Sequence, residues 1–153
     1  MVNPQSTLLN LDELRALTGD NDGAQRVAWS PMWLKAREWF QAKLDELQRT
    51  VAPALEHHYD AAGNHWVTLP GASEKALVLG SHLDSVPNGG WLDGCLGVLA
   101  GLEVLTELAR EYNGKPPITV KLVDWADEEG ARFGRSLFGS SAFAGSPGCI
   151  RWD

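Results

Sequence analysis

Several features that mark particular protein classes are scarce or missing in this chain of 153 residues. Its two cysteines, Cys95 and Cys149, belong to no C-x-x-C spacing, which argues against a disulfide framework or a cysteine-based zinc finger. No apolar run approaches the length of a membrane span, and residues 1–10 lack the basic and apolar regions of a secretion signal. We therefore expect a cytoplasmic protein.

Positive charge is also in short supply. The chain has 13 Lys and Arg against 20 Asp and Glu, a net charge of -7, so its average surface repels nucleic acids and anionic membranes. No G-x-S-x-G sequence is present, so the chain lacks the nucleophile motif of a serine hydrolase. What remains, 44% hydrophobic and 22% charged residues, is typical of one ordinary globular domain.

Two helices are predicted in the N-terminal third. Asn10 can cap a short helix over residues 11–17, and Gly19 follows where that helix would end. Ser30 followed by proline is a strong helix start, and apolar residues then recur at spacings of three and four. This spacing predicts an amphipathic helix over residues 31–50.

The hydrophobic period then changes to that of strands. Residues 55–69 contain two short stretches separated by the turn-rich residues 60–64, which predicts a hairpin. Residues 76–80 form a short continuous apolar run, typical of a strand buried on both faces.

A long apolar segment, residues 94–112, predicts a helix, in which Gly97 and Gly101 would allow close approach to a neighbour. The β-rich residues 118–125 follow after a glycine and proline breaker. Strand, helix and strand in this order predict a βαβ unit with parallel strands. The expected fold class is α/β, with a mixed, largely parallel sheet flanked by helices.

Polar residues gather where the two strands of this unit end. His82 and Asp84 follow the first strand, Glu128 and Glu129 follow the second, and a glycine-rich loop carries Asp93 to the start of the long helix. Ligands of open α/β sheets bind beyond the carboxyl ends of the strands, where loops and helix starts converge. An imidazole and several carboxylates form a ligand set for first-row divalent metals, so we predict a metal site here.

Each residue also has an ordinary explanation. A histidine at a strand end is usually structural, an aspartate at a helix start is usually a cap, and the Glu128-Glu129 pair could open a helix. Their coincidence at one sheet edge favours the metal site. Asp84 could then accept an N–H of the His82 imidazole, and one glutamate could ligate while the other takes a proton.

Other candidates are assigned structural roles. Cys95 lies in an apolar run and is expected to pack as a small hydrophobe, and the seven tryptophans are expected to pack in the core. The glycine-flanked serines are expected to shape a turn: Ser136, Ser140 and Ser141. The hairpin histidines are expected on a solvated strand face: His57, His58 and His65.

Four sequence blocks resemble a known family: GSHLDSVPNGG at 80–90, LDG at 92–94, DEEGARFG at 127–134 and GSSAF at 139–143. They are similar to the N-carbamoyl-L-amino-acid hydrolase, allantoate amidohydrolase and β-ureidopropionase group of the two-metal aminoacylase/carboxypeptidase superfamily. The similarity runs from about residue 21 to residue 145.

The resemblance implies a role for each residue. His82 would bind one metal, Asp93 would bridge both, Glu129 would bind the second, and Glu128 would be the general base, with Asp84 behind the histidine. The implied reaction is metal-dependent hydrolysis of a linear amide or ureide C–N bond in a small molecule. The metals in such relatives are zinc, manganese, nickel or cobalt.

The resemblance also implies a longer enzyme, usually a homodimer, whose two remaining histidine ligands, substrate-binding arginine and lid or dimerisation domain come later in the sequence. On this basis residues 1–153 are expected to form a partial catalytic domain that is inactive alone, and the unfamiliar ending 146–153 suggests truncation or a frameshift. A related metallopeptidase or aminoacylase and a non-catalytic fragment are the alternatives.

Overall fold

The computed structural model describes residues 2–145, so Cys149 and the ending 146–153 lie outside the described residues. None of the helices in the described part combines the length and apolar character that a membrane span requires. The elements follow in this order: α1 (Pro4–Thr18), α2 (Pro31–Thr50), β1 (Glu56–Tyr59), β2 (His65–Leu69), β3 (Ala76–Ser81), α3 (Cys95–Glu111), β4 (Thr119–Asp124) and α4 (Phe138–Ala144).

Helix α1 begins seven residues before the predicted start, at Pro4 rather than Leu11. The Asn3 side chain accepts the N–H of Gln5 and caps the helix, so the prediction that Asn10 is the cap was wrong. Proline at the first helical position supports this earlier start. The end at Gly19 is confirmed, as are both bounds of α2, whose cap Ser30 accepts the N–H of Trp33.

The four strands form one mixed sheet in the order β1-β2-β4-β3. Strands β3 and β4 are parallel, which confirms the βαβ unit, and the β1-β2 hairpin is also confirmed. The hairpin joins β4 in the antiparallel sense, so two of the three described strand pairs are antiparallel.

Strand β3 lies at the edge of the described sheet, where it pairs with β4 on one side only. Leu77 and Val78 are 44% and 47% exposed, so the prediction of a strand buried on both faces was wrong. A continuous apolar run is compatible with burial but does not determine where in a sheet the strand lies.

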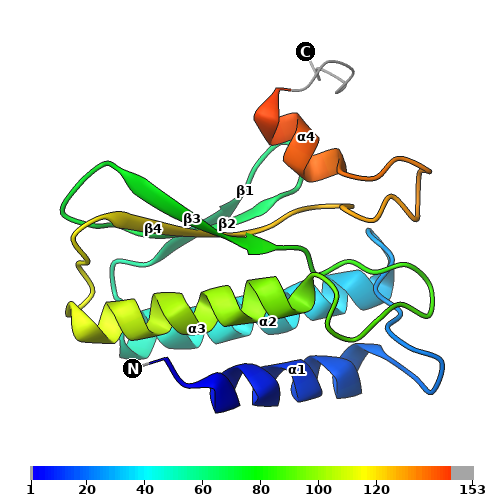
Figure 1. Ribbon diagram of the computed structural model, residues 1–153, viewed down its shortest axis with the longest axis horizontal. Coiled ribbons are helices and arrows are strands. Elements are labelled where there is room, and N and C mark those ends of the chain that lie inside the picture. Colours follow the sequence, from blue (N-terminus) through cyan, green and yellow to red (C-terminus); the bar gives the residue numbers. More distant parts are fainter. Residues whose placement is uncertain (1, 146–153) are drawn as a thin grey trace.

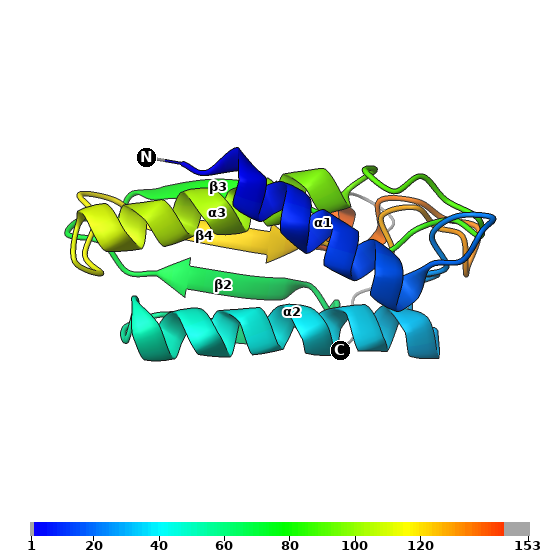
Figure 2. The same cartoon turned by 90° about the horizontal axis from the view of Figure 1, so that it is seen from below.

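The helices cover the sheet unequally. Figure 1 shows α2 and α3 against one face, α1 beyond them on the side away from the sheet, and α4 on the opposite side. Figure 2, seen from below, shows α1 running obliquely across α3 toward α2. The core lies between these layers and includes Leu14, Phe40, Leu44, Val67, Leu99, Leu105 and Leu122.

Close contact between α3 and the sheet depends on a small residue. A Cβ atom on Gly101 would lie 2.6 Å from the Leu122 side chain, so glycine allows the approach, as predicted. Trp33 and Trp66 are 2% and 6% exposed, in agreement with the expected packing role for these two tryptophans. The βαβ unit thus holds the carboxyl ends of β3 and β4 at one edge of the sheet.

Candidate metal centre

His82 is the first residue after β3, and its side chain is buried. Its Nδ1 atom lies 3.0 Å from the main-chain oxygen of Asp84. A proton on Nδ1 would be donated to that carbonyl, which leaves the lone pair of Nε2 free to ligate a metal. The Nε2 atom lies 3.8 Å from Oε1 of Glu129.

Asp93 lies just before α3, and its carboxylate does not cap that helix: the N-cap residue is Gly94, with no side-chain cap hydrogen bond. Gly94 has φ 66°, and a Cβ atom there would lie 2.4 Å from the oxygen and 2.6 Å from Nδ1 of His82. Glycine at this position therefore lets the start of α3 approach the imidazole. The usual capping explanation for Asp93 does not apply.

Glu129 follows β4 in a turn, and not in the first turn of a helix as one alternative held. One ligand atom each from His82, Asp93 and Glu129 lie within 4.8 Å of one another. Burial, and then the adjacent Asp93 carboxyl group, raise the pKa of Glu129. Two carboxylates so close together repel, and a cation between them would relieve that repulsion.

Asp84 connects the two polar segments in a way that was not predicted. Its Oδ1 atom lies 3.6 Å from Nδ1 of His82, so the imidazole bonds to the main-chain carbonyl of Asp84 instead of its carboxylate. The carboxylate accepts the backbone N–H groups of Glu128 and Glu129, at 3.2 and 3.1 Å. Burial raises the pKa of Asp84 to about 6, and these hydrogen bonds oppose the shift.

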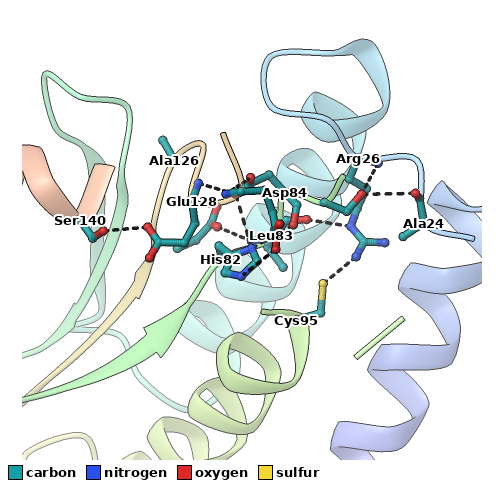
Figure 3. A network of polar contacts seen from close by, with 12 residues as sticks. Ala24, Arg26, His82, Leu83, Asp84, Cys95, Ala126, Glu128 and Ser140 are labelled. Atoms are coloured by element: carbon teal, nitrogen blue, oxygen red, sulfur yellow. Dashed lines mark hydrogen bonds and ion pairs between the residues drawn. The ribbon is translucent and has the colours of Figure 1, made fainter. Parts of the chain in front are cut away.

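Glu128 has a partner that the sequence did not reveal. Its Oε2 atom accepts the Ser140 hydroxyl at 2.8 Å (Figure 3). The chain folds back after the glutamates, and the N–H of Leu137 bonds to the main-chain oxygen of Glu128. Ser140 and Ser141 lie in α4, so the prediction that they shape a turn was wrong. No local sequence pattern predicts this contact, because it forms only when the loop before α4 brings Ser140 back to Glu128.

Cys95 is buried in the core, as predicted, and burial raises the pKa of its thiol to about 11. Its Sγ atom lies 2.9 Å from Nη2 of Arg26, a contact that the apolar surroundings of Cys95 in the sequence did not indicate. Such a thiol is a poor nucleophile at neutral pH.

The three hairpin histidines do not share a solvated face, so that prediction was wrong for His65. This residue is completely buried beside Phe40 and stacks on Tyr59, with ring centroids 4.3 Å apart. Its Nε2 atom lies 3.3 Å from Nδ1 of His57, whereas His58 is exposed. Burial, and then Arg37, lower the pKa of His65 to about 3. An alternating strand pattern places only every second residue toward the helix layer.

The donor set of the cluster fits a divalent metal. One imidazole nitrogen and two carboxylates suit borderline ions such as zinc and also harder ions such as manganese. Glu128 lies next in the chain to one of these donors and is oriented by a hydroxyl group, so its carboxylate is available for proton transfer. The arrangement is chemically suited to activating water.

A family model, that of peptidase family M28, matches residues 64–150. Two curated relatives are the allantoate amidohydrolase of Escherichia coli (strain K12), 37% identical over 125 residues, and the N-carbamoyl-L-amino-acid amidohydrolase of Pseudomonas sp. (strain NS671), 43% identical over 138 residues. These matches cover 80% and 90% of this chain, but 29% and 32% of the relatives.

A solved structure agrees with these sequence matches. The hydantoinase/carbamoylase family amidase from Burkholderia ambifaria has a TM-score of 0.84 and 29% identity, over 94% of this chain and 34% of that chain. The chain therefore spans about a third of the length of its relatives.

Proposed function

The chain belongs to peptidase family M28, and on that premise we propose that it supplies the metal-binding residues of an amidohydrolase that cleaves linear amide C–N bonds. The observation that carries the proposal is the convergence of His82, Asp93 and Glu129, whose ligand atoms lie within 4.8 Å of one another. The sequence resemblance assigns ligand roles to the same three residues, and Asp93 would help to hold both ions.

Zinc, manganese, nickel and cobalt are the proposed metals. When bound, such an ion supplies Lewis acidity that polarises the substrate carbonyl and makes a water molecule more acidic. The protein holds the ligands in place through short-range contacts: the carbonyl of Asp84 orients His82, and the carboxylate of Asp84 fixes the backbone of Glu129.

Glu128 is the proposed general base. Its carboxylate takes a proton from the attacking water, the oxygen of that water adds to the carbonyl carbon, and the C–N bond then breaks. The same carboxyl group delivers the proton to the leaving nitrogen. Ser140 donates to the carboxylate of Glu128 and holds it in one orientation during both transfers. Asp84 acts through the backbone of the glutamate pair as a positioning residue.

The proposed substrates are small molecules, because the relatives are named for allantoate and N-carbamoyl-L-amino acids. Hydrolysis of a carbamoyl amino acid would give the amino acid, ammonia and carbon dioxide. We also propose a cytoplasmic homodimer, in keeping with the resemblance and with the free thiol of Cys95. A related metallopeptidase or aminoacylase is the second candidate, and the name of the matching family supports the peptidase.

The test combines metal binding with hydrolysis. We expect Mn²⁺ or Co²⁺ to bind the purified protein. The substitution His82→Ala should weaken that binding at least about tenfold, because a proposed ligand nitrogen is lost. In a longer protein that also carries the later ligands implied by the resemblance, ammonia release from allantoate and from N-carbamoyl amino acids is compared with amine release from N-acyl amino acids and dipeptides. Binding that is insensitive to His82→Ala would refute the proposed centre, and preference for the second substrate set would favour the second candidate.

A further inference from the structure

The peptide segment between His82 and Asp84 is held from two sides. The backbone N–H of Leu83 donates to Oδ1 of Asp124 at 2.7 Å, and its carbonyl oxygen accepts Nε–H of Arg26 at 2.8 Å. Figure 3 shows Arg26 approaching this segment from the side opposite to Glu128. Leu83 itself is completely buried, so both hydrogen bonds lie inside the protein.

Arg26, the partner of the Leu83 carbonyl oxygen, is only 1% exposed. Besides the carbonyl of Leu83, its guanidinium donates to the hydroxyl of Thr18 at 3.1 Å and to Sγ of Cys95 at 2.9 Å. The backbone of Arg26 also takes part, because its carbonyl oxygen accepts the backbone N–H of Ser85. A buried cation whose hydrogen-bond partners are a carbonyl, a hydroxyl and a thiol is costly to fold, which points to a role beyond packing.

Asp124, the partner of the Leu83 N–H, is the last residue of strand β4 and is completely buried. Its Oδ2 atom accepts Nε–H of Arg37 at 2.7 Å, and Arg37 also donates to the main-chain oxygens of Asp124 and Gly63, at 3.2 and 2.6 Å. Burial raises the pKa of Asp124, and the guanidinium of Arg37 opposes that shift. One oxygen of this carboxylate, Oδ2, is thus held by Arg37, and the other, Oδ1, accepts the N–H of Leu83.

We propose that Arg26 and Asp124 are positioning residues that clamp the Leu83 peptide and thereby fix His82 and Asp84 for metal binding. The inference rests on the proposed function. Rotation of the chain at Leu83 would move the imidazole on one side and, on the other, the carboxylate that holds the glutamate pair. Hydrogen bonds to both the N–H and the carbonyl side of this residue resist that rotation, whereas packing of the Leu83 side chain alone would resist it less.

The test uses the complete chain and four variants. Arg26→Met removes the guanidinium while keeping a long side chain, and Asp124→Leu removes the acceptor. Asp124→Asn is the conservative variant: its oxygen can still accept the N–H of Leu83, whereas its amide N–H₂ replaces the oxygen that accepts Nε–H of Arg37. Leu105→Ala is the matched control, because it opens a cavity in the core and destabilises the protein without touching the clamp.

Two readouts separate positioning from general destabilisation. The first is the Kd for Co²⁺ together with its visible spectrum, which reports coordination geometry. The second is the ratio of the hydrogen-exchange rates of the Leu83 and Val123 amides, because global destabilisation changes both amides together. We expect Arg26→Met and Asp124→Leu to raise Kd about 10- to 100-fold and to alter the spectrum. Asp124→Leu should raise the exchange ratio, Asp124→Asn should give values between those of Asp124→Leu and wild type, and Leu105→Ala should leave both readouts near wild type.

The possible failures are distinguishable. If the wild-type chain binds Co²⁺ but Arg26→Met and Asp124→Leu keep its Kd, spectrum and exchange ratio, the clamp is refuted and the proposed metal centre stands. If the wild-type chain binds no Co²⁺, the proposed centre fails and this inference fails with it. Should Asp124→Leu not fold, Arg26→Met decides by the same criteria, and a wild-type Kd and spectrum in that variant would refute the clamp.

Discussion

The carboxylate of Asp84 accepts the backbone N–H of Glu129 at 3.1 Å. This bond joins the segment after β3 to the segment after β4, so two groups from separate strands are held in one arrangement. The same carboxylate also accepts the N–H of Glu128 at 3.2 Å. A single buried side chain thus sets the backbone position of both glutamates relative to His82.

Asp84→Asn should weaken metal binding about 10- to 100-fold, the range expected for residues that orient ligands. Asparagine offers one acceptor oxygen, so its amide N–H₂ would face one of the two backbone N–H donors and displace it. Titration calorimetry with Mn²⁺ measures the effect. The control is Asp45→Asn, which alters an exposed aspartate near His57 and should leave the affinity unchanged. Equal affinities in all three proteins would contradict the positioning role.

Glu128→Gln and Glu129→Gln should separate metal binding from catalysis. Glutamine at 129 removes a proposed ligand charge and should raise the metal Kd at least tenfold, on the order of other ligand-shell changes. Glutamine at 128 should leave Kd within about threefold but, in a longer protein that also carries the later ligands implied by the resemblance, lower metal-dependent hydrolysis about 10²- to 10⁴-fold, because the general base is lost. Affinity and ammonia release are measured on the same preparations. The reverse pattern would exchange the two assignments.

Gly94→Ala should both destabilise the protein and weaken metal binding. At φ 66° an alanine is strained, and its Cβ atom would collide with the backbone and ring of His82. Gly114→Ala is a matched control, since Gly114 has φ 79° and an added Cβ would meet nothing within 4 Å. Gly114→Ala should cost about 1 kcal/mol of backbone strain, and Gly94→Ala should cost more, because φ 66° with ψ -52° lies outside the left-handed region. Only Gly94→Ala should lose further stability and raise the metal Kd, as measured by urea unfolding and calorimetry.

The pH dependence of folding should reflect His65, whose pKa is lowered to about 3 by burial and by Arg37. Because the folded state disfavours its protonation, the stability contribution of the neutral ring is present above about pH 6.5 and is lost as the pH falls toward 3. Between pH 7.5 and 5 this loss amounts to about 2 kcal/mol.

His65→Phe should therefore lose about 2 kcal/mol less than wild type over that interval in urea unfolding. The control is His58→Phe, which removes an exposed imidazole from the same hairpin and should follow the wild-type curve. Parallel pH curves for His65→Phe and wild type would show that the buried ring does not control acid unfolding.

Local sequence determined the main elements of the fold. Ser30 and Pro31 set the start of α2, and the apolar runs before His82 and Glu128 set two strands joined by a helix. Parallel strands of a βαβ unit end at the same sheet edge, so the proximity of His82 and Glu129 follows from element order alone.

Tertiary structure decided which partner each polar group has. The imidazole of His82 meets Asp84 as expected, but at its main-chain oxygen, and the Asp84 carboxylate accepts the backbone N–H groups of residues 128 and 129. Ser140 reaches Glu128 only because the loop after β4 folds back. Burial was equally non-local, since it placed His65 inside the protein and left β3 exposed at the sheet edge. Spacing along the chain reports local conformation, whereas these contacts join residues that are distant in sequence and form only when the layers pack.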